Sequence, residues 1–168
     1  MSGERVVILV DVQNVYYTTK QAFGRHFDYN AFWARAAAGR EVVAAIAYAV
    51  DRGDEKQRQF QNILRGIGFE VKLKPFIQRR DGSAKGDWDV GITLDAIELA
   101  EQVDRIILVS GDGDFDLLLQ RVRQRFDTAS DVYGVSRLTA ESLVRSASRF
   151  IAIDEALLLP RPSSQPSR

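Results

Sequence analysis

Six short apolar runs alternate with longer stretches of helical periodicity along this chain. A continuous apolar run between polar residues is typical of a strand that is buried on both faces of a parallel sheet. Parallel neighbours need a crossover between them, and the intervening stretches are long enough to supply helices. The sequence therefore predicts a three-layer, doubly wound α/β fold with a mainly parallel sheet and helices on both faces. The expected strands are 5–10, 42–50, 69–77, 105–109, 131–135 and 150–153, and the expected helices are 14–23, 30–38, 55–67, 87–103, 115–125 and 139–146.

The size of the chain favours a single domain. Its 168 residues, 45% of them hydrophobic, suffice for one buried core. We expect residues 1–159 to form this domain and residues 160–168, which are rich in proline and serine, to be a disordered tail. No stretch approaches the roughly 18 consecutive apolar residues of a membrane span, and the N-terminus lacks the layout of a signal peptide. The expected location is therefore the cytoplasm, without contact to a membrane.

The residue types that the chain lacks exclude several kinds of chemistry. It has no cysteine and a single histidine, His26, for which we expect a surface position. Disulfides, thiolate metal sites and cysteine nucleophiles are therefore excluded, and histidine catalysis nearly so. Any metal must be held mainly by oxygen atoms, which suit Mg²⁺ or Mn²⁺ better than Zn²⁺.

The charges of the chain balance, with 23 basic and 23 acidic residues. There is therefore no bulk attraction to nucleic acid or to an anionic membrane. Without seven aspartates that lie in three short segments, the positive charges exceed the negative ones by seven. If these aspartates bind metal, the rest of the surface favours phosphates. The seven are Asp11, Asp87, Asp89, Asp95, Asp112, Asp114 and Asp116.

Three of the expected strands are followed by an acidic residue. Asp11 ends the first strand, Asp51 follows the second, and Asp112 follows the strand that runs into Ser110. In open parallel sheets, ligands bind beyond the carboxyl ends of the strands, where the strand order reverses. We therefore expect these three carboxylates at one edge of the sheet.

The segment 110–116, with the sequence Ser-Gly-Asp-Gly-Asp-Phe-Asp, is a glycine-containing turn that leads into a helix. Aspartates two residues apart repel one another unless a cation or solvent screens them. The alternative is that Asp112 or Asp114 simply caps the helix, although a cap needs one carboxylate rather than three. The spacing excludes an EF-hand loop, because Leu117 and Arg123 replace the required glycine and glutamate. It also excludes a dinucleotide fingerprint and a P-loop.

The expected helix 87–103 carries two further acids. Helical periodicity points Asp89 inward, where a carboxylate needs a metal or a hydrogen-bonding neighbour. Asp95 falls on the polar face, and a solvated charge and a functional carboxylate remain equal alternatives for it.

The first strand ends with Asp11, followed three residues later by Asn14. The pair supplies either two oxygen ligands or one ligand and an orienting group, while a plain helix cap at Asn14 is an equal alternative. Gln13 argues against an aspartyl-phosphate phosphatase, which carries an aspartate at that position.

Basic and aromatic residues accompany the acidic segments. A polar loop is expected at residues 79–83. Phosphate contacts are weighed against ordinary surface positions for Lys85, Arg79, Arg80 and Arg137. Stacking on bases is weighed against packing for Tyr16, Tyr17 and Trp88.

Three blocks carry a resemblance to a known family: Asp11-Val12-Gln13-Asn14, then Lys85-Gly86 with Asp89-Val90 and Asp95, then Ser110-Gly111-Asp112-Gly113-Asp114-Phe115. Together they resemble the NYN domain of the LabA-like group, within the PIN-like nuclease superfamily, over residues 4 to 154. One departure is Phe126-Asp127-Thr128, where the family usually has a glycine before the next strand. The resemblance implies a PIN-like sheet of order 3-2-1-4-5 and a ribonuclease that hydrolyses RNA phosphodiester bonds with Mg²⁺ or Mn²⁺.

The resemblance also assigns roles to single residues. It implies the catalytic residues Asp11, Asp89, Asp112 and Asp114. The first three are the principal metal ligands, and Asp114 and Asp95 are outer ones. It also implies the orienting residues Asn14 and Ser110 and an accessory acid, Asp51. We add phosphate contacts at Lys85, Arg79 and Arg80. The expected partner is RNA, single-stranded, and a homodimer is compatible with the sequence. The alternatives are a catalytically weak RNA-binding or regulatory module on the same fold, and a metal-dependent phosphatase that acts on nucleotides.

Overall fold

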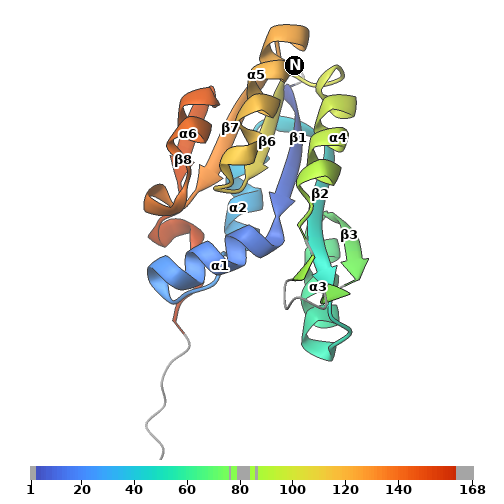
Figure 1. The fold of residues 1–168 in the computed structure, drawn as a ribbon, viewed down its shortest axis with the longest axis vertical. Coiled ribbons are helices and arrows are strands. Elements are labelled where there is room, and N and C mark those ends of the chain that lie inside the picture. Colours follow the sequence, from blue (N-terminus) through green and yellow to red (C-terminus); the bar gives the residue numbers. More distant parts are fainter. Residues whose placement is uncertain (1–2, 76, 79–83, 86, 162–168) are drawn as a thin grey trace, which may run out of the picture.

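A six-stranded parallel sheet forms the centre of the computed structural model, which describes residues 3–75, 77–78, 84–85 and 87–161 (Figure 1). All neighbouring strands in it run parallel. The predicted order 3-2-1-4-5 is confirmed, and the last strand extends it by one. From edge to edge the strands are β3 (Glu70–Pro75), β2 (Arg40–Asp51), β1 (Glu4–Asp11), β6 (Arg105–Val109), β7 (Ala129–Gly134) and β8 (Arg149–Ala152).

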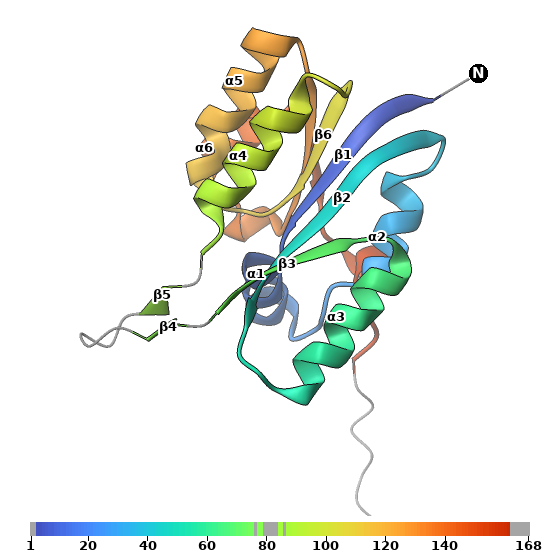
Figure 2. The same cartoon turned by 90° about the vertical axis from the view of Figure 1, so that its right-hand side faces the viewer.

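Helices cover both faces of the sheet, so the predicted three-layer architecture is confirmed (Figure 2). Successive side chains of β1 point to opposite faces of the sheet, as in any strand. Val6, Ile8 and Val10 pack into the core below one helix layer, and Val7 and Leu9 pack into the core below the other. The first layer contains α1 (Val12–Phe23), α2 (Tyr29–Ala36) and α3 (Glu55–Ile67), and the second contains α4 (Asp89–Ala100), α5 (Asp116–Phe126) and α6 (Glu141–Ser146). None of the helices in the described part of the chain is long and apolar enough to cross a membrane.

Aspartate caps explain where the helices of the first layer begin. The Asp28 side chain accepts from the amide of Ala31 at 3.0 Å, and the Asp54 side chain accepts from the amide of Gln57 at 2.8 Å. Such caps satisfy amides that have no partner inside the helix. The predicted helix 55–67 is confirmed to the residue. The first helix begins two residues earlier than predicted, because its cap is Asp11 rather than Asn14.

The predicted strand 69–77 is too long. β3 ends at Pro75, whose missing N–H cannot continue a ladder. Ile77–Gln78 instead form β4, which pairs antiparallel with β5 (Ala84–Lys85) in a separate small hairpin. The predicted polar loop 79–83 lies outside the described residues. So does most of the predicted tail, from residue 162 onward.

A buried ion cluster closes the amino-terminal end of the sheet. Asp131 is fully buried in β7, and its carboxylate accepts from Arg105 at 2.6 Å and from Arg149 at 2.9 Å. Arg40 lies 3.7 Å away. These arginines are the first residues of β6, β8 and β2, so the Asp131 cluster links three strands around β7.

Candidate metal centre

The strand order reverses between β1 and β6, which are neighbours at the middle of the sheet (Figure 1). Asp11 is the last residue of β1, and Ser110 directly follows β6. This is the position at which open parallel sheets bind their ligands. The structure therefore brings the first and third acidic segments of the sequence together at one edge.

Hydrogen bonds hold the two segments against each other. The Ser110 hydroxyl donates to Oδ2 of Asp11 at 3.2 Å, and Oγ of Ser110 accepts from the Asp112 amide at 3.2 Å. Asn14 Oδ1 accepts from the Gly111 amide at 2.9 Å. Asn14 is thus not the cap of α1, because the Asp11 side chain accepts from the amide of Asn14. Ser110 and Asn14 therefore link the two segments, and their role as orienting residues stays a prediction.

The two glycines of the turn are required by close packing. A Cβ atom on Gly111 would lie 2.7 Å from the carbonyl oxygen of Leu138, and one on Gly113 would lie 2.8 Å from Cβ of Ala140. The amide of Ala140 also donates to the carbonyl of Gly111 at 3.0 Å. The segment after β7 therefore presses against this turn and holds the alternating aspartates in place.

Three carboxylates converge beside Asp11. Asp89, Asp112 and Asp114 each offer an oxygen atom, and these atoms lie within 4.8 Å of one another. Asp112 also caps the short helix η1 (Gly113–Phe115), since its Oδ1 accepts from the Asp114 amide at 2.9 Å. The capping alternative is therefore correct for Asp112 but leaves the other two carboxylates unexplained. We call Asp11, Asp89, Asp112 and Asp114 the acidic centre.

The carboxylates of the acidic centre are difficult to ionise together. Burial raises the pKa of Asp11 to about 6, and the charges of Asp112 and Asp87 add to this, although hydrogen bonds from Asn14 and Ser110 oppose it. The pKa of Asp89 rises to about 7 through burial, a hydrogen bond with Asp112 and the negative charges around it. Oxygen donors crowded in this way fit a hard divalent cation such as Mg²⁺ or Mn²⁺.

We expect the metal-free protein to lose stability as the pH rises from about 4 to about 7. In the unfolded chain, Asp11 releases its proton near the ordinary value of 3.8, whereas the folded protein holds it up to about 6. The folded state binds more protons in this window, so its stability falls as the pH rises, by about 3 kcal/mol for Asp11. Urea unfolding in EDTA at pH 5 and pH 8 measures about half of this loss, because the carboxyl group of the unfolded chain is already mostly ionised at pH 5. Mg²⁺ at pH 8 should restore stability.

The matched control for this pH dependence is Asp11→Asn, which cannot titrate at this position. The variant should show a flatter dependence of unfolding free energy on pH than the intact protein. Equal slopes for the two proteins would contradict the assignment of the effect to Asp11.

The structure does not bring Asp95 or Asp51 into the acidic centre. The Asp95 carboxylate accepts from Lys72 Nζ at 2.7 Å and from the Tyr48 hydroxyl at 2.8 Å, so neighbouring strands supply its partners. Asp95 therefore takes part in an ion pair here, and its role as an outer metal ligand stays a prediction. Asp51 is exposed, and its Oδ1 accepts from the Gly53 amide at 2.8 Å in the turn after β2.

The basic and aromatic residues for which ligand contacts were predicted differ in where they lie and what they bind. Arg79 and Arg80 lie outside the described residues, as does the side chain of Lys85. Arg137 donates to the carbonyl of Ala22. Trp88 is tied into the fold, because its indole N–H donates to the Ala49 carbonyl at 2.8 Å.

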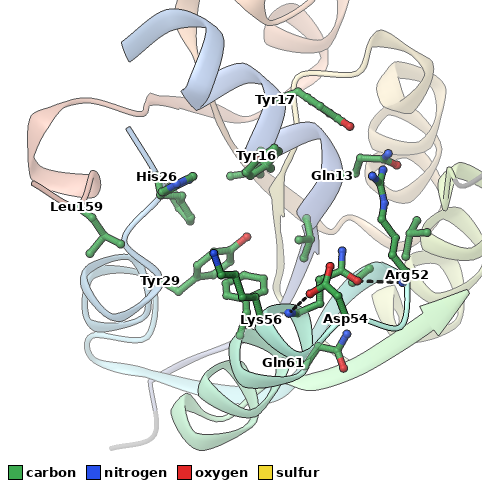
Figure 3. Close-up of a pocket in the computed structure, with 17 residues that line it drawn as sticks. Gln13, Tyr16, Tyr17, His26, Tyr29, Arg52, Asp54, Lys56, Gln61 and Leu159 are labelled. Carbon is green, nitrogen blue, oxygen red and sulfur yellow. Dashed lines mark hydrogen bonds between the residues drawn. The ribbon is translucent and has the colours of Figure 1, made fainter. Parts of the chain in front are cut away.

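A pocket of about 660 Å³ lies between α1 and α3 (Figure 3). Its lining includes Val12 and Gln13, the two residues that follow Asp11. His26 is on the surface as predicted, and it stacks on Tyr16 with ring centres 5.6 Å apart. This pocket could not be predicted from the sequence, because its walls come from segments distant in the chain that carry no shared motif.

Comparisons with known proteins agree with this fold. Residues 5–154 match the sequence model of the NYN domain. The low amplitude and bright protein LabA of Synechococcus elongatus is 29% identical over 161 residues, which is 90% of this chain and 84% of that protein. A crystal structure of a Vibrio parahaemolyticus protein of unknown function is 63% identical, with a TM-score of 0.90 over 94% of this chain and 97% of that one. A carbohydrate kinase from Agrobacterium tumefaciens, at 12% identity and a TM-score of 0.51 over 88% of this chain and 60% of that one, shares the fold alone.

Proposed function

This chain belongs to the NYN domain family, and from that membership and its acidic centre we propose that it hydrolyses phosphodiester bonds of RNA with Mg²⁺ or Mn²⁺. The observation that carries the proposal is the convergence of Asp89, Asp112 and Asp114 within 4.8 Å at the point where the strand order reverses. Carboxylates crowded in this way are costly to a protein that merely binds phosphate, because they repel it. They are useful to one that binds a metal.

The residues of the acidic centre would hold the metal. A bound Mg²⁺ or Mn²⁺ supplies positive charge for the phosphate and lowers the pKa of a bound water molecule to make a nucleophile. Ser110 and Asn14 keep Asp11 and the 110–112 turn in register through the hydrogen bonds described above. Loss of the proton that Asp89 holds up to about pH 7 frees its carboxylate for ligation.

Phosphate contacts outside the acidic centre are proposed for Lys85, Arg79 and Arg80. These cations lie in the sequence just before α4, which begins with Asp89. Cations beside an acidic centre offset its repulsion of an incoming strand, and binding that depends on them weakens as salt rises. We propose single-stranded RNA as the substrate.

The test uses the purified protein with end-labelled single-stranded RNA, a structured RNA and a DNA of the same sequence. We expect cleavage of single-stranded RNA with Mg²⁺ or Mn²⁺ and none in EDTA. Binding without cleavage, in either metal and on every RNA, would replace the nuclease by a regulatory RNA-binding module. Hydrolysis of mononucleotides alone would replace it by a phosphatase.

A further inference from the structure

The pocket between α1 and α3 has the size and position of a second binding site. Its volume of about 660 Å³ lies in the range of ligand sites in proteins. The end of β2 contributes Ala49 and Val50, and the first turn of α1 contributes Val12 and Gln13. Because Asp11 caps α1, the pocket and the acidic centre share the beginning of this helix.

One wall of the pocket is aromatic. Tyr16 and His26 lie side by side with an angle of 17° between their rings, and Tyr17 meets Tyr16 edge-on at 5.3 Å (Figure 3). Tyr16 is 41% exposed and Tyr17 is 49% exposed. Aromatic faces that are open to a pocket stack on flat rings, and every nucleobase offers such a ring.

Two polar side chains in the pocket have no partner in the described part of the protein. Gln61 is 5% exposed and Tyr29 is 9% exposed, and no described residue forms a hydrogen bond with either side chain. The hydroxyl of Tyr29 points toward the middle of the pocket (Figure 3). No completely buried side-chain nitrogen or oxygen of the described residues lacks a partner, so the polar atoms of these two side chains are open to solvent in the pocket. An amide that donates and accepts, and a hydroxyl that does both, match the kinds of polar group on the edge of a nucleobase.

Charged groups of both signs lie in the lining of the pocket. Arg52, Lys56 and Asp54 are exposed there (Figure 3). On the inner side, burial and then the negative charge of Asp11 raise the pKa of Tyr29 above its ordinary value. Asp11 therefore lies within electrostatic reach of the pocket, on its inner side.

We propose that this pocket binds an unstacked nucleobase of the RNA strand, next to the phosphodiester bond that lies at the acidic centre. This inference rests on the proposed function, since the same strand has to reach both sites. Tyr16 and His26 provide the stacking surface, and Gln61 and Tyr29 bind the edge of the base. Recognition of splayed-out bases by stacking and by hydrogen bonds to their edges is how proteins bind single-stranded RNA.

The test measures binding of labelled single-stranded RNA in EDTA, which separates it from cleavage. Tyr16→Ala should weaken binding about tenfold, the scale of losing one stacked base. The double variant Gln61→Leu with Tyr29→Phe should weaken it about tenfold as well, the scale of losing the hydrogen bonds to one base edge. Neither change should matter for an abasic strand that carries the same phosphates. Tyr133→Phe is the matched control. It also removes a tyrosine hydroxyl, but Tyr133 is buried outside the pocket, so RNA binding should not change.

The outcomes distinguish this inference from the proposed function. Unchanged RNA affinity in both pocket variants, or equal losses for intact and abasic strands, would overturn the base pocket even if the protein cleaves RNA. Weaker binding in the pocket variants without any cleavage by the intact protein would support the pocket and reject the nuclease. Circular dichroism spectra confirm that each variant is folded, and absence of RNA binding by the intact protein would overturn the pocket as well.

Discussion

Replacing Asp112 by asparagine is expected to lower the rate of RNA cleavage at least about 100-fold while the protein stays folded. A loss of this order is typical when one group that stabilises the transition state is removed. Asp112 is a member of the acidic centre and shares a hydrogen bond with Asp89. Asparagine keeps an Oδ1 atom that can accept from the Asp114 amide, so the cap of η1 survives. Initial rates of cleavage with Mn²⁺ measure the effect.

The same substitution should leave RNA binding in EDTA unchanged or stronger. It removes one negative charge from a group that repels phosphate. It also removes a proposed metal ligand, so the rise in melting temperature that we expect Mg²⁺ to cause in the intact protein should vanish. RNA binding and thermal unfolding together therefore distinguish a variant that no longer binds the metal from one that no longer binds RNA or is unfolded.

The matched control for Asp112→Asn is Asp127→Asn. Asp127 is exposed and precedes β7, at the opposite end of the sheet from the acidic centre. Its φ of 55° lies in the left-handed region, which asparagine tolerates well. The control should cleave RNA like the intact protein. If Asp112→Asn also cleaves at the intact rate, the acidic centre is not the catalytic site.

Replacing Asp131 by asparagine is expected to lower the free energy of unfolding by about 3–5 kcal/mol, which is the scale of breaking a buried ion pair from one side. Asp131 is fully buried, and its two oxygens bind Arg105 and Arg149. Asparagine has one acceptor oxygen and no charge, so the partly buried Arg105 keeps only Glu4 as an acidic partner. Urea unfolding at neutral pH measures the loss.

The control for Asp131→Asn is Glu41→Gln on the neighbouring surface. Glu41 pairs with Arg5 at 3.3 Å, but about half of each side chain is exposed. Pairs of this kind contribute only about 0–1 kcal/mol, because water screens them. Equal losses in the two variants would show that the Asp131 cluster contributes no more than a surface pair. RNA cleavage at moderate temperature should persist in both, since the cluster lies far from the acidic centre along the strands.

The elements of this fold were predictable because they depend on residues that are close in the chain. The apolar run 105–109 and the helix 55–67 were predicted to the residue, since period, caps and glycine stops are local signals. The parallel arrangement followed from the alternation of strands and helices, while the strand order came from the resemblance to a family. The parallel arrangement and the strand order together predicted that Asp11 and Asp112 lie at the same edge of the sheet.

Other features depend on how distant elements pack, and local pattern carries no information about them. Helical periodicity left a solvated charge and a functional carboxylate as alternatives for Asp95. The packing of α4 beside β2 and β3 instead brings it to Lys72 and Tyr48. For Asn14 the sequence left a helix cap and a functional role as equal alternatives, because only the folded chain shows that its side chain binds the Gly111 amide, 97 residues away.

The sequence by itself determined the fold class, the elements and the candidate acids, because backbone hydrogen bonding and strand burial leave periodic marks in nearby residues. The tertiary structure alone decided which acids meet and which are neutralised by a lysine. It also decided that Tyr16, Tyr29 and Gln61, from three different helices, line one pocket. Such contacts arise when side chains pack between layers, and packing couples residues by position in space rather than along the chain.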